Sequence, residues 1–204
     1  MTEAPRIYLL TPPEIVPESF PDRLARVLDA VPVACLRLDL ASRDEARLTH
    51  AAEAVAAVAR ARELPVVIAG HVALAGRLGL DGVHLDTGAG GIRAARRALG
   101  AKAIVGAFAG TSRHGGLVAG EAGADYVSFG PVEAGGLGSG EVAQTALFEW
   151  WQQMVTVPVV AEGAITPDAA ARLAPHVDFL AVGEEIWRHD EPAAALARIR
   201  DAAR

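Results

Sequence analysis

The feature that most constrains this chain is a regular alternation of short β-branched or apolar runs with longer stretches rich in Ala, Leu, Arg and Glu. The first kind of run is typical of buried strands and the second of amphipathic helices. Because parallel strands need a helical crossover between them, the alternation predicts a parallel sheet with helices packed against it. The expected strands are residues 7–10, 34–38, 66–68, 82–85, 103–107, 126–129, 157–161 and 179–182. The expected helices are residues 20–31, 44–62, 72–78, 92–99, 113–122, 146–154, 167–173 and 192–203.

The number of strand–helix units decides between two parallel architectures. A doubly wound open sheet also alternates, but it usually has fewer strands than are expected here. The expected units favour closure into a barrel, and a chain of 204 residues lies near the lower limit for that fold. No segment resembles a linker or a repeat of solenoid length. We therefore predict a single (β/α)₈ TIM barrel, formed as one domain by residues 1–204.

Two helix starts carry recognisable capping signals. Ser42 or Asp44 offers a short side-chain acceptor to the free N–H groups of the second helix. Thr166 followed by Pro167 is typical of an N-cap and a first helical turn.

Composition and charge exclude several classes of partner. The formal net charge is −6 and no Lys/Arg cluster builds a basic face, so we expect no nucleic-acid partner. Charged residues or glycines interrupt every apolar run before it reaches membrane-spanning length, so we expect no membrane partner. Residues 1–6 lack the basic and apolar regions of a secretory signal, and the single cysteine, Cys35, fits a reducing compartment. We therefore expect a cytoplasmic protein whose partner is a small-molecule ligand.

Two familiar kinds of site are disfavoured. Lys102 is the only lysine, and it precedes an expected strand, whereas barrel active sites lie after the strands. A lysine imine mechanism is therefore not expected. Residues 135–140, Gly-Gly-Leu-Gly-Ser-Gly, lie away from a strand end and no Lys-Ser/Thr follows them. This pattern favours a flexible loop over a nucleotide-binding fingerprint.

Four segments, in order along nearly the whole chain, resemble the motifs of one known family. They are Leu36-Arg37, Gly82-Val-His-Leu85, residues 123–132 (GADYVSFGPV) and residues 158–167 (PVVAEGAITP). In these segments the chain is similar to the thiamine phosphate synthase/TenI superfamily, whose fold is a (β/α)₈ barrel. Thiamine phosphate synthases join a pyrimidine pyrophosphate to a thiazole phosphate with Mg²⁺ and release pyrophosphate, and TenI relatives include a thiazole tautomerase. The resemblance implies a link to thiamine metabolism.

The same comparison of motifs shows where this chain departs from the synthase pattern. The chemistry needs cations for the leaving pyrophosphate, carboxylates for Mg²⁺ and backbone N–H groups for the second substrate's phosphate. Arg37 matches the family's arginine, but Cys35 and Asp39 stand where the family has glutamine and lysine. Phe108 replaces the serine that ends the fifth strand, and residues 133–137 replace a Thr-x-Thr-Lys loop.

The metal ligands and the tautomerase histidine of the family are also missing at their aligned positions. Ala69-Gly70 stands where the family has Asn-Asp, and Ala89 stands where it has the second metal carboxylate. Asp86 lies three positions before Ala89 and would substitute only after a loop rearrangement. The tautomerase histidine aligns with Gly110, and His114 would need another loop path to replace it. We therefore predict no metal and no other cofactor.

The end of the site where the family binds phosphate is altered as well. Gly163 is kept, but Ala164 adds a Cβ where the backbone should approach the phosphate. Gly183-Glu184 replaces the family's Val-Ser, and Glu185 follows. A carboxylate beside a phosphate dianion is repulsive by roughly several kcal/mol in a partly desolvated pocket. We expect Glu184 to place its carboxylate at this mouth, so that the pocket does not prefer phosphate.

Some candidate residues also have a purely structural interpretation. Arg37 either binds a ligand or forms an ion pair with Asp39 or another nearby carboxylate. His71, His84 and Asp86 would together make a weak metal constellation, but a hydrogen-bonded core position for His84 is favoured.

The predicted binding residues are charged, histidine or small residues near the carboxyl ends of the strands. Glu162, Glu184 and Glu185 are candidate general bases, although the start of a helix also favours the last two. No residue is assigned a catalytic role. The predicted substrate-binding residues are Arg37, Asp39, His84, Asp86, Glu162, Gly163, Ala164, Gly183 and Glu184.

The resemblance and the departures from it lead to three functional hypotheses. In the first, the protein acts in thiamine metabolism on a thiazole- or pyrimidine-like molecule, without normal synthase activity. In the second, it is a non-catalytic small-molecule-binding or regulatory member of the family. In the third, it is an active thiamine phosphate synthase with a rearranged site. Enzymatic activity is thus left open, and so is a homodimer, whose contact an exposed member of Trp150-Trp151 would mark.

Overall fold

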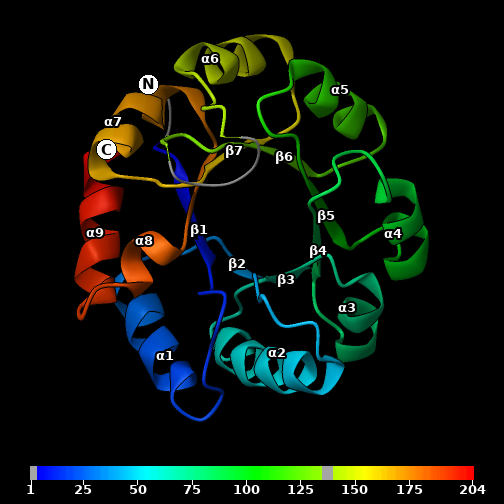
Figure 1. The fold of residues 1–204 in the computed structure, drawn as a ribbon, viewed down its shortest axis with the longest axis vertical. Helices are drawn as coiled ribbons and strands as arrows, with labels where there is room; N and C mark the ends of the chain where they lie inside the picture. The colour runs from blue at the N-terminus through cyan, green and yellow to red at the C-terminus, as the bar shows by residue number, and fades with distance from the viewer. Residues whose placement is uncertain (1–3, 135–139) are drawn as a thin grey trace.

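The computed structural model describes residues 4–134 and 140–204, and over these residues eight parallel strands close into a barrel. The strands are β1 (Arg6–Leu10), β2 (Cys35–Leu38), β3 (Val66–Ala69), β4 (Gly82–Leu85), β5 (Ile104–Phe108), β6 (Tyr126–Phe129), β7 (Val159–Glu162) and β8 (Phe179–Val182). Hydrogen bonds join them in chain order, and β8 pairs with β1 to close the barrel. Figure 1 looks along the barrel and shows a ring of helices outside it. The predicted (β/α)₈ TIM barrel is confirmed.

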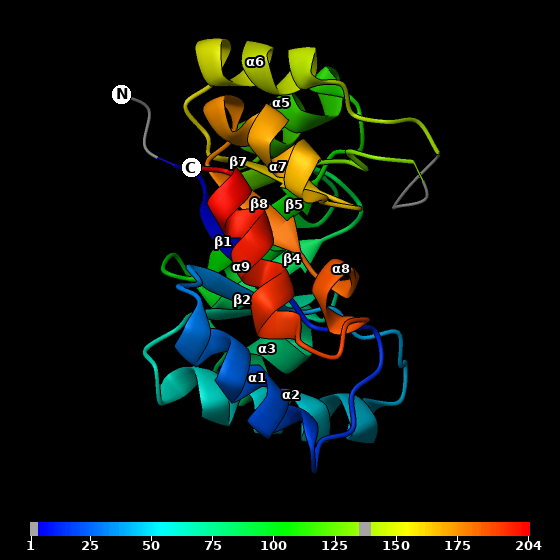
Figure 2. The same ribbon diagram turned by 90° about the vertical axis from the view of Figure 1, so that its left-hand side faces the viewer.

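A helix follows each strand, with bounds within two residues of those expected. The longer helices are α1 (Phe20–Ala30), α2 (Glu45–Arg60), α3 (Val72–Leu78), α4 (Ile92–Leu99), α5 (Arg113–Glu121), α6 (Thr145–Met154), α7 (Pro167–Leu173) and α9 (Pro192–Ala202). Two short elements were not expected: the 3₁₀ turn η1 (Ala174–His176) and α8 (Glu184–Trp187), which directly follows β8. Figure 2 shows α8 beside α9, on the side of the barrel opposite the C-terminus.

The expected caps are present at the starts of α2 and α7. Asp44 accepts a hydrogen bond from the backbone N–H of Arg47 (2.9 Å), while Ser42 accepts one from the N–H of Asp44 (3.2 Å). Asp44 is therefore the N-cap, and Ser42 supports it. Thr166 caps α7 by accepting from the backbone N–H of Ala169 (3.1 Å).

Three aspartates fasten the amino-terminal end of the barrel. Each directly precedes an even-numbered strand and accepts a hydrogen bond from a backbone N–H at the start of the strand before it. The bonds join Asp81 to Val66, Asp125 to Val105 and Asp178 to Val159, each at 2.7 Å. These bonds hold neighbouring strands together at the amino-terminal end of the barrel. Active sites of barrel proteins lie at the opposite end, where the strands finish.

The barrel interior holds a core of its own, separate from the larger core between the strands and the helices. It is formed by Tyr8, Val67, Tyr126, Val160 and Ala181. Because side chains alternate along a strand, the residues two positions further on also point inward, nearer to the carboxyl ends. This alternation brings buried polar side chains of β2 and β7 to the mouth of the barrel.

Two of the expectations about the surface can be compared with the structure, and one cannot. The glycine-rich patch lies outside the described residues, except for Gly140. No described helix is both long and apolar enough to cross a membrane. Trp151 is buried, and Arg113 lies over the ring of the partly buried Trp150, 4.7 Å from its centroid. The tryptophan pair thus gives no argument for a homodimer, which stays a prediction.

Gly106 provides a test of how the interior is packed. A Cβ added at Gly106 would lie 1.9 Å from Cζ of Tyr126, whose ring is buried inside the barrel. We expect Gly106→Ala to lower the free energy of unfolding by about 1–3 kcal/mol or more, because overpacking forces the ring to move. Urea denaturation measures the change.

The control for this variant is Gly120→Ala on α5, where the nearest atom lies at 3.4 Å. It should be neutral or stabilising by roughly 0.5–1 kcal/mol, since alanine favours a helix over glycine. Equal effects of the two substitutions would contradict the packing argument.

Candidate functional site

The carboxyl ends of β1, β2, β7 and β8 surround a cavity of about 280 Å³. This is the end at which barrel proteins place their active sites. Six predicted substrate-binding residues lie in its wall: Arg37, Asp39, Gly163, Ala164, Gly183 and Glu184. The rest of the lining comes from Leu10, Thr11, Pro13, Ala181, Glu185 and Arg188.

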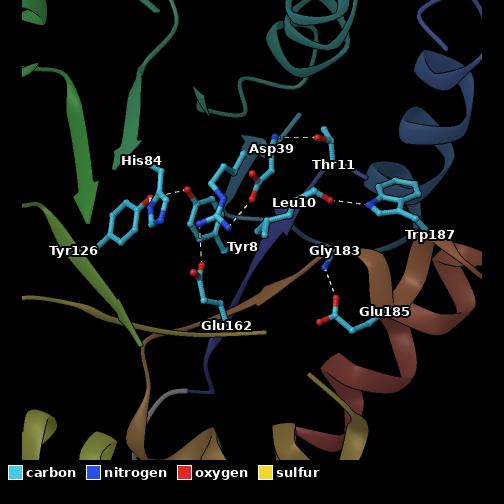
Figure 3. Close-up of polar contacts among 11 residues, drawn as sticks. Tyr8, Leu10, Thr11, Asp39, His84, Tyr126, Glu162, Gly183, Glu185 and Trp187 are labelled. Atoms are coloured by element: carbon cyan, nitrogen blue, oxygen red, sulfur yellow. Dashed lines mark hydrogen bonds and ion pairs between the residues drawn. The ribbon is translucent and has the colours of Figure 1, made fainter. Parts of the chain in front are cut away.

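Arg37 lies at the floor of this cavity and is held by two carboxylates. Its Nη1 donates to Oε2 of Glu162 and its Nη2 to Oδ2 of Asp39, both at 2.8 Å (Figure 3 shows the two carboxylates). Arg37 and Glu162 are each only 2% exposed, whereas Asp39 is 39% exposed. Thr11 fixes the second partner, because its Oγ1 accepts from the backbone N–H of Asp39 (3.0 Å). The predicted ion pair between Arg37 and Asp39 is therefore confirmed. Arg37 also lines the cavity.

The charges around Arg37 are not balanced. Burial raises the pKa of Glu162, and the positive charge of Arg37 opposes this rise without cancelling it. Burial also raises the pKa of Asp86, and the negative charge of Asp39 adds to the effect. For Arg37, burial acts to lower the pKa, but the negative charge of Glu162 and other neighbours outweighs it and leaves the pKa above its ordinary value. Arg37 thus stays charged among carboxylates that surround it.

A chain of neutral polar groups lies beneath Arg37 inside the barrel. The hydroxyl groups of Tyr8 and Tyr126 are hydrogen-bonded at 2.6 Å, and Nδ1 of His84 lies 2.9 Å from the Tyr126 hydroxyl. The rings of His84 and Tyr126 are stacked (Figure 3). The guanidinium group of Arg37 lies over the Tyr8 ring, 5.8 Å from its centroid. Burial, together with the charge of Arg37, holds the pKa of His84 well below its ordinary value. His84 is therefore a neutral, hydrogen-bonded core histidine, as favoured from the sequence.

Glu185 closes the other side of the cavity. Its Oε1 accepts a hydrogen bond from the backbone N–H of Ile165 (3.0 Å), and its Oε2 accepts one from the backbone N–H of Gly183 (2.7 Å). Figure 3 shows the carboxylate turned back toward Gly183. Glu184, which the sequence led us to expect at this place, is exposed on the cavity rim. The carboxylate bound to the backbone thus belongs to the next residue along the chain.

The loop after β7 has an unusual backbone conformation. Gly163 has φ 86° and Ala164 has φ 61°, both in the left-handed region. An alanine in this conformation costs roughly 1–2 kcal/mol, so surrounding contacts must hold it. One such contact is the hydrogen bond from the backbone N–H of Val132 to the carbonyl of Gly163 (3.0 Å). The loop therefore keeps a defined conformation, although Ala164 replaces the second glycine of the family motif.

The remaining histidine and carboxylate candidates do not gather into a metal site. Asp86 is exposed just after β4, outside the cavity lining, and His114 is exposed on α5. His71 is the N-cap of α3 and makes no capping bond with its side chain. Across residues 4–134 and 140–204, no three or more His, Cys, Asp and Glu side chains are arranged to hold a metal ion.

The family's Mg²⁺ can be tested against the residues at its expected place. β3 ends at Ala69, Gly70 follows with φ 71°, and Ala89 lies in the turn after β4. None of these residues carries an oxygen-bearing side chain, and Mg²⁺ prefers carboxylate oxygens. The residues present do not fit the ion at these positions.

Sequence reasoning missed several residues of the site. Tyr8 and Tyr126 could have been identified from the alternation within their strands, which turns both toward the interior. Thr11 and Arg188 carry no comparable signal, because each lies in a segment after a strand whose path depends on the tertiary structure. The bonds of Glu185 depend on where α8 begins, and a four-residue helix has no periodicity to reveal this.

The Arg37–Glu162 pair makes a prediction about stability. Arg37→Met should lower the free energy of unfolding by roughly 3–5 kcal/mol, because Glu162 would remain as an unpaired buried charge. Adding Glu162→Leu to the same chain should recover most of that loss, since no buried charge then remains. Chemical denaturation of both variants measures the difference.

An exposed pair supplies the control for this experiment. Arg62→Met breaks the contact with Asp29, which is 64% exposed, and should cost about 0–1 kcal/mol. A double variant no more stable than Arg37→Met would show that the unpaired carboxylate is not the cause of the loss.

The buried His84 makes a prediction about acid stability. Its pKa is lowered in the folded protein, so below about pH 6.5 the unfolded chain binds a proton that the folded chain does not. Its contribution to the free energy of unfolding is therefore present above that pH. As the pH falls below it, this contribution should be lost at up to about 1.4 kcal/mol per pH unit.

Denaturation at several pH values, in the wild type and in His84→Gln, isolates this slope. The variant should lose it, whereas His50→Gln, at a position 63% exposed, should keep it. The assignment fails if the wild type and His84→Gln show the same dependence on pH.

Comparison with known proteins agrees with the fold and with the sequence motifs. The model of the family described as thiamine monophosphate synthase matches residues 7–186. A curated relative from Rhodospirillum centenum, named thiamine-phosphate synthase, is 42% identical over 195 residues and covers 94% of each chain. A relative of the same name from Erythrobacter litoralis is 39% identical over 203 residues, or 96% of this chain and 95% of the relative.

A solved structure gives the same result for the fold. Thiamine phosphate pyrophosphorylase from Pyrococcus furiosus superimposes with a TM-score of 0.84 over 97% of this chain and 95% of that chain. At 21% identity, this likeness shows the fold alone. The family match and the two curated relatives go further, because they extend over nearly the whole chain: it belongs to the thiamine monophosphate synthase family.

Proposed function

We propose that this protein binds a thiazole- or pyrimidine-like molecule of thiamine metabolism in the cavity above Arg37, and that it lacks normal synthase activity. One observation carries the proposal: both terminal nitrogens of Arg37 donate to carboxylates, Glu162 and Asp39, at 2.8 Å. Asp39 stands where the resemblance places a lysine. The positive charge of Arg37 is thus compensated by carboxylates of the protein itself.

The chemistry of the synthase explains why this pairing matters. Expelling pyrophosphate builds negative charge on the leaving group, and the site must supply cations to stabilise it. Here Arg37 is outnumbered by Glu162 and Asp39, so a polyanion entering the cavity meets a net negative charge. A neutral or cationic ring meets no such barrier.

The residues at the family's metal positions also support the proposal that normal synthase activity is lacking. Ala69, Gly70 and Ala89 offer no side-chain oxygen where the family binds Mg²⁺. A magnesium ion would otherwise screen the pyrophosphate and compensate for the missing lysine. We therefore include no metal or other cofactor in the proposed function.

A polar ligand would still find partners at the floor of the cavity. Nε of Arg37 is buried and has no hydrogen-bond partner in the described part of the chain. A buried donor without an acceptor is unfavourable by about 1–3 kcal/mol, so a ring nitrogen or hydroxyl that reached it would be stabilised. This supports binding of a small heteroaromatic molecule, whether or not turnover follows.

A second candidate is an active synthase with a rearranged site. Two relatives, 42% and 39% identical, are named thiamine-phosphate synthase, and each aligns over nearly its whole length. Asp86 lies close enough to the cavity for the negative charge of Asp39 to contribute to its raised pKa, after the larger effect of burial. In this candidate, Asp86 takes over as a metal ligand after the loop beyond β4 moves.

An activity assay decides between these candidates. The protein is mixed with the pyrimidine pyrophosphate, the thiazole phosphate and Mg²⁺, and pyrophosphate release is followed. We expect no release above the protein-free background, because the charge of Arg37 is already paired with Glu162 and Asp39 and the metal positions lack donors. Thermal shift with the non-phosphorylated thiazole and pyrimidine alcohols should show stabilisation by at least one of them.

Each alternative has its own signature in these measurements. Catalytic release of pyrophosphate that is lost in Asp86→Asn but kept in Asp168→Asn, a helix-start carboxylate on α7, would establish the rearranged synthase. Chemical turnover of a stabilising alcohol would identify an enzyme, and stabilisation without turnover a binding or regulatory protein. Stabilisation by none of the compounds would overturn the proposal.

A further inference from the structure

We infer that Arg37, Ser128 and Glu162 form a binding site for one neutral hydroxyl group inside the mouth of the barrel. Water or the alcohol of a ligand supplies this group, because both accept one hydrogen bond and donate another. The inference rests on the proposed function only for the ligand alcohol, and it holds for the ligand-free protein without it.

Ser128 on β6 is a buried serine whose hydroxyl lacks a partner. Its exposed fraction is 0%, and its Oγ makes no hydrogen bond within residues 4–134 and 140–204. Its neighbours in register are Phe108 on β5 and Val160 on β7, and neither side chain carries a polar atom. Nearly all buried polar groups of native proteins are hydrogen-bonded, if not to the protein then to ordered water or a ligand. The hydroxyl of Ser128 therefore calls for a bound group.

The side chain of Ser128 points into the barrel. Tyr126, two residues earlier, and Val160, the register partner of Ser128, both belong to the interior core. Phe129, the next residue, packs outward against α6. Because side chains alternate along a strand, Ser128 is the inward residue that follows Tyr126 toward the carboxyl end of β6.

The ion pair brings the guanidinium group of Arg37 toward β6. Arg37 starts from β2, but its Nη1 reaches Glu162 at 2.8 Å, on the strand next to β6. Glu162 is the inward residue that follows Val160, the register partner of Ser128. Burial raises the pKa of Tyr126, and the positive charge of Arg37 opposes this rise, as expected of a guanidinium group near β6. The hydroxyl of Ser128 and the guanidinium group thus lie in the same part of the barrel interior.

Three polar atoms in this part of the interior have capacity for a bound group. Nε of Arg37 is a buried donor without an acceptor in the described chain, and Oγ of Ser128 both donates and accepts. Glu162 accepts from Arg37 with Oε2, while its Oε1 accepts no hydrogen bond from a described residue. Internal waters typically make about three hydrogen bonds, which matches these three atoms.

The combination of donor and acceptor selects the chemistry of the occupant. A hydroxyl oxygen accepts from Nε of Arg37 and donates its hydrogen to Oε1 of Glu162. An ammonium group has no lone pair to accept from Nε, and the charge of Glu162 repels a phosphate or a carboxylate. The site therefore takes a neutral hydroxyl group.

The first test is a high-resolution crystal structure of the ligand-free wild type. We expect an ordered water oxygen at about 2.7–3.2 Å from both Nε of Arg37 and Oγ of Ser128. A well-ordered barrel interior with no oxygen at this place would overturn the inference.

Urea denaturation of Ser128→Ala is a second test, in which the direction of the change decides. If a water holds the hydroxyl, the substitution removes a hydrogen bond and the unfolding midpoint should move to lower urea. If the hydroxyl has no partner, the substitution removes an unpaired buried group, and a midpoint at higher urea would contradict the inference. Ser19→Ala is the control, because Ser19 is exposed and its side chain makes no capping bond at the start of α1. Its midpoint should stay close to that of the wild type.

Crystals grown with the thiazole or pyrimidine alcohol identify the occupant in the presence of a ligand. If the hydroxyl of the alcohol replaces the water, Ser128→Ala should weaken binding of that alcohol about fivefold to tenfold. It should leave the affinity of the analogue with a methyl group in place of the hydroxymethyl group unchanged, which a purely structural role of Ser128 would not. A water that stays in place beside the bound alcohol would support the site with solvent as its occupant.

Failure of the proposed function has a different signature. Pyrophosphate release by the wild type, or the absence of binding by every alcohol, would overturn that function. Neither result changes the ordered water or the unfolding midpoint of Ser128→Ala, so the two failures can be told apart.

Discussion

The ion pair between Arg37 and Glu162 sets the conditions for the rest of the site. It joins β2 to β7 across the end of the barrel, with both side chains only 2% exposed. A guanidinium group is unstable in such surroundings unless its charge is matched and its N–H groups are bonded. Asp39 and the face of the Tyr8 ring supply further contacts, so the arginine is stabilised from several sides. The same contacts remove it as a free cation for a ligand.

The polar groups of the barrel interior are uncharged on one side of this ion pair and charged on the other. Beneath Arg37, burial raises the pKa of both tyrosine hydroxyls and lowers that of His84, so this layer stays uncharged. A positive charge directly above makes protonation of His84 still less favourable. Gly106 allows the layer to form, because no side chain other than hydrogen leaves space for the Tyr126 ring. The barrel thus carries neutral polar groups below and charged groups at its mouth.

The sequence predicts the fold better than it predicts the site, and the reason is the range of the interactions. Strands, helices and the caps at Asp44 and Thr166 depend on neighbours a few residues away, which the chain displays directly. The alternation of units then leaves few architectures. The partner of Arg37 lies 125 residues away, so the sequence could suggest an ion pair but not identify Glu162. The place of Asp86 outside the cavity lining likewise follows from a loop path that no local pattern specifies.

Glu184 and Glu185 show that sequence comparison can miss the correct side chain by one residue. Glu184 was expected to lie at the mouth of the site, but Glu185 is the residue whose carboxylate is bonded to the backbone. Alignment with the family's serine points to Glu184, since that residue replaces its hydroxymethyl group. In the structure α8 begins at Glu184, and consecutive residues on a helix point about 100° apart. The side chain of Glu184 therefore reaches the rim, while Glu185 turns back to accept from Gly183, two residues before it. Free N–H groups at a helix start favour a carboxylate nearby. The glutamate whose side chain points toward these groups therefore forms the hydrogen bonds. Motif comparison could place negative charge at this mouth, but only the direction of the first helical turn decides which side chain is bonded to the backbone.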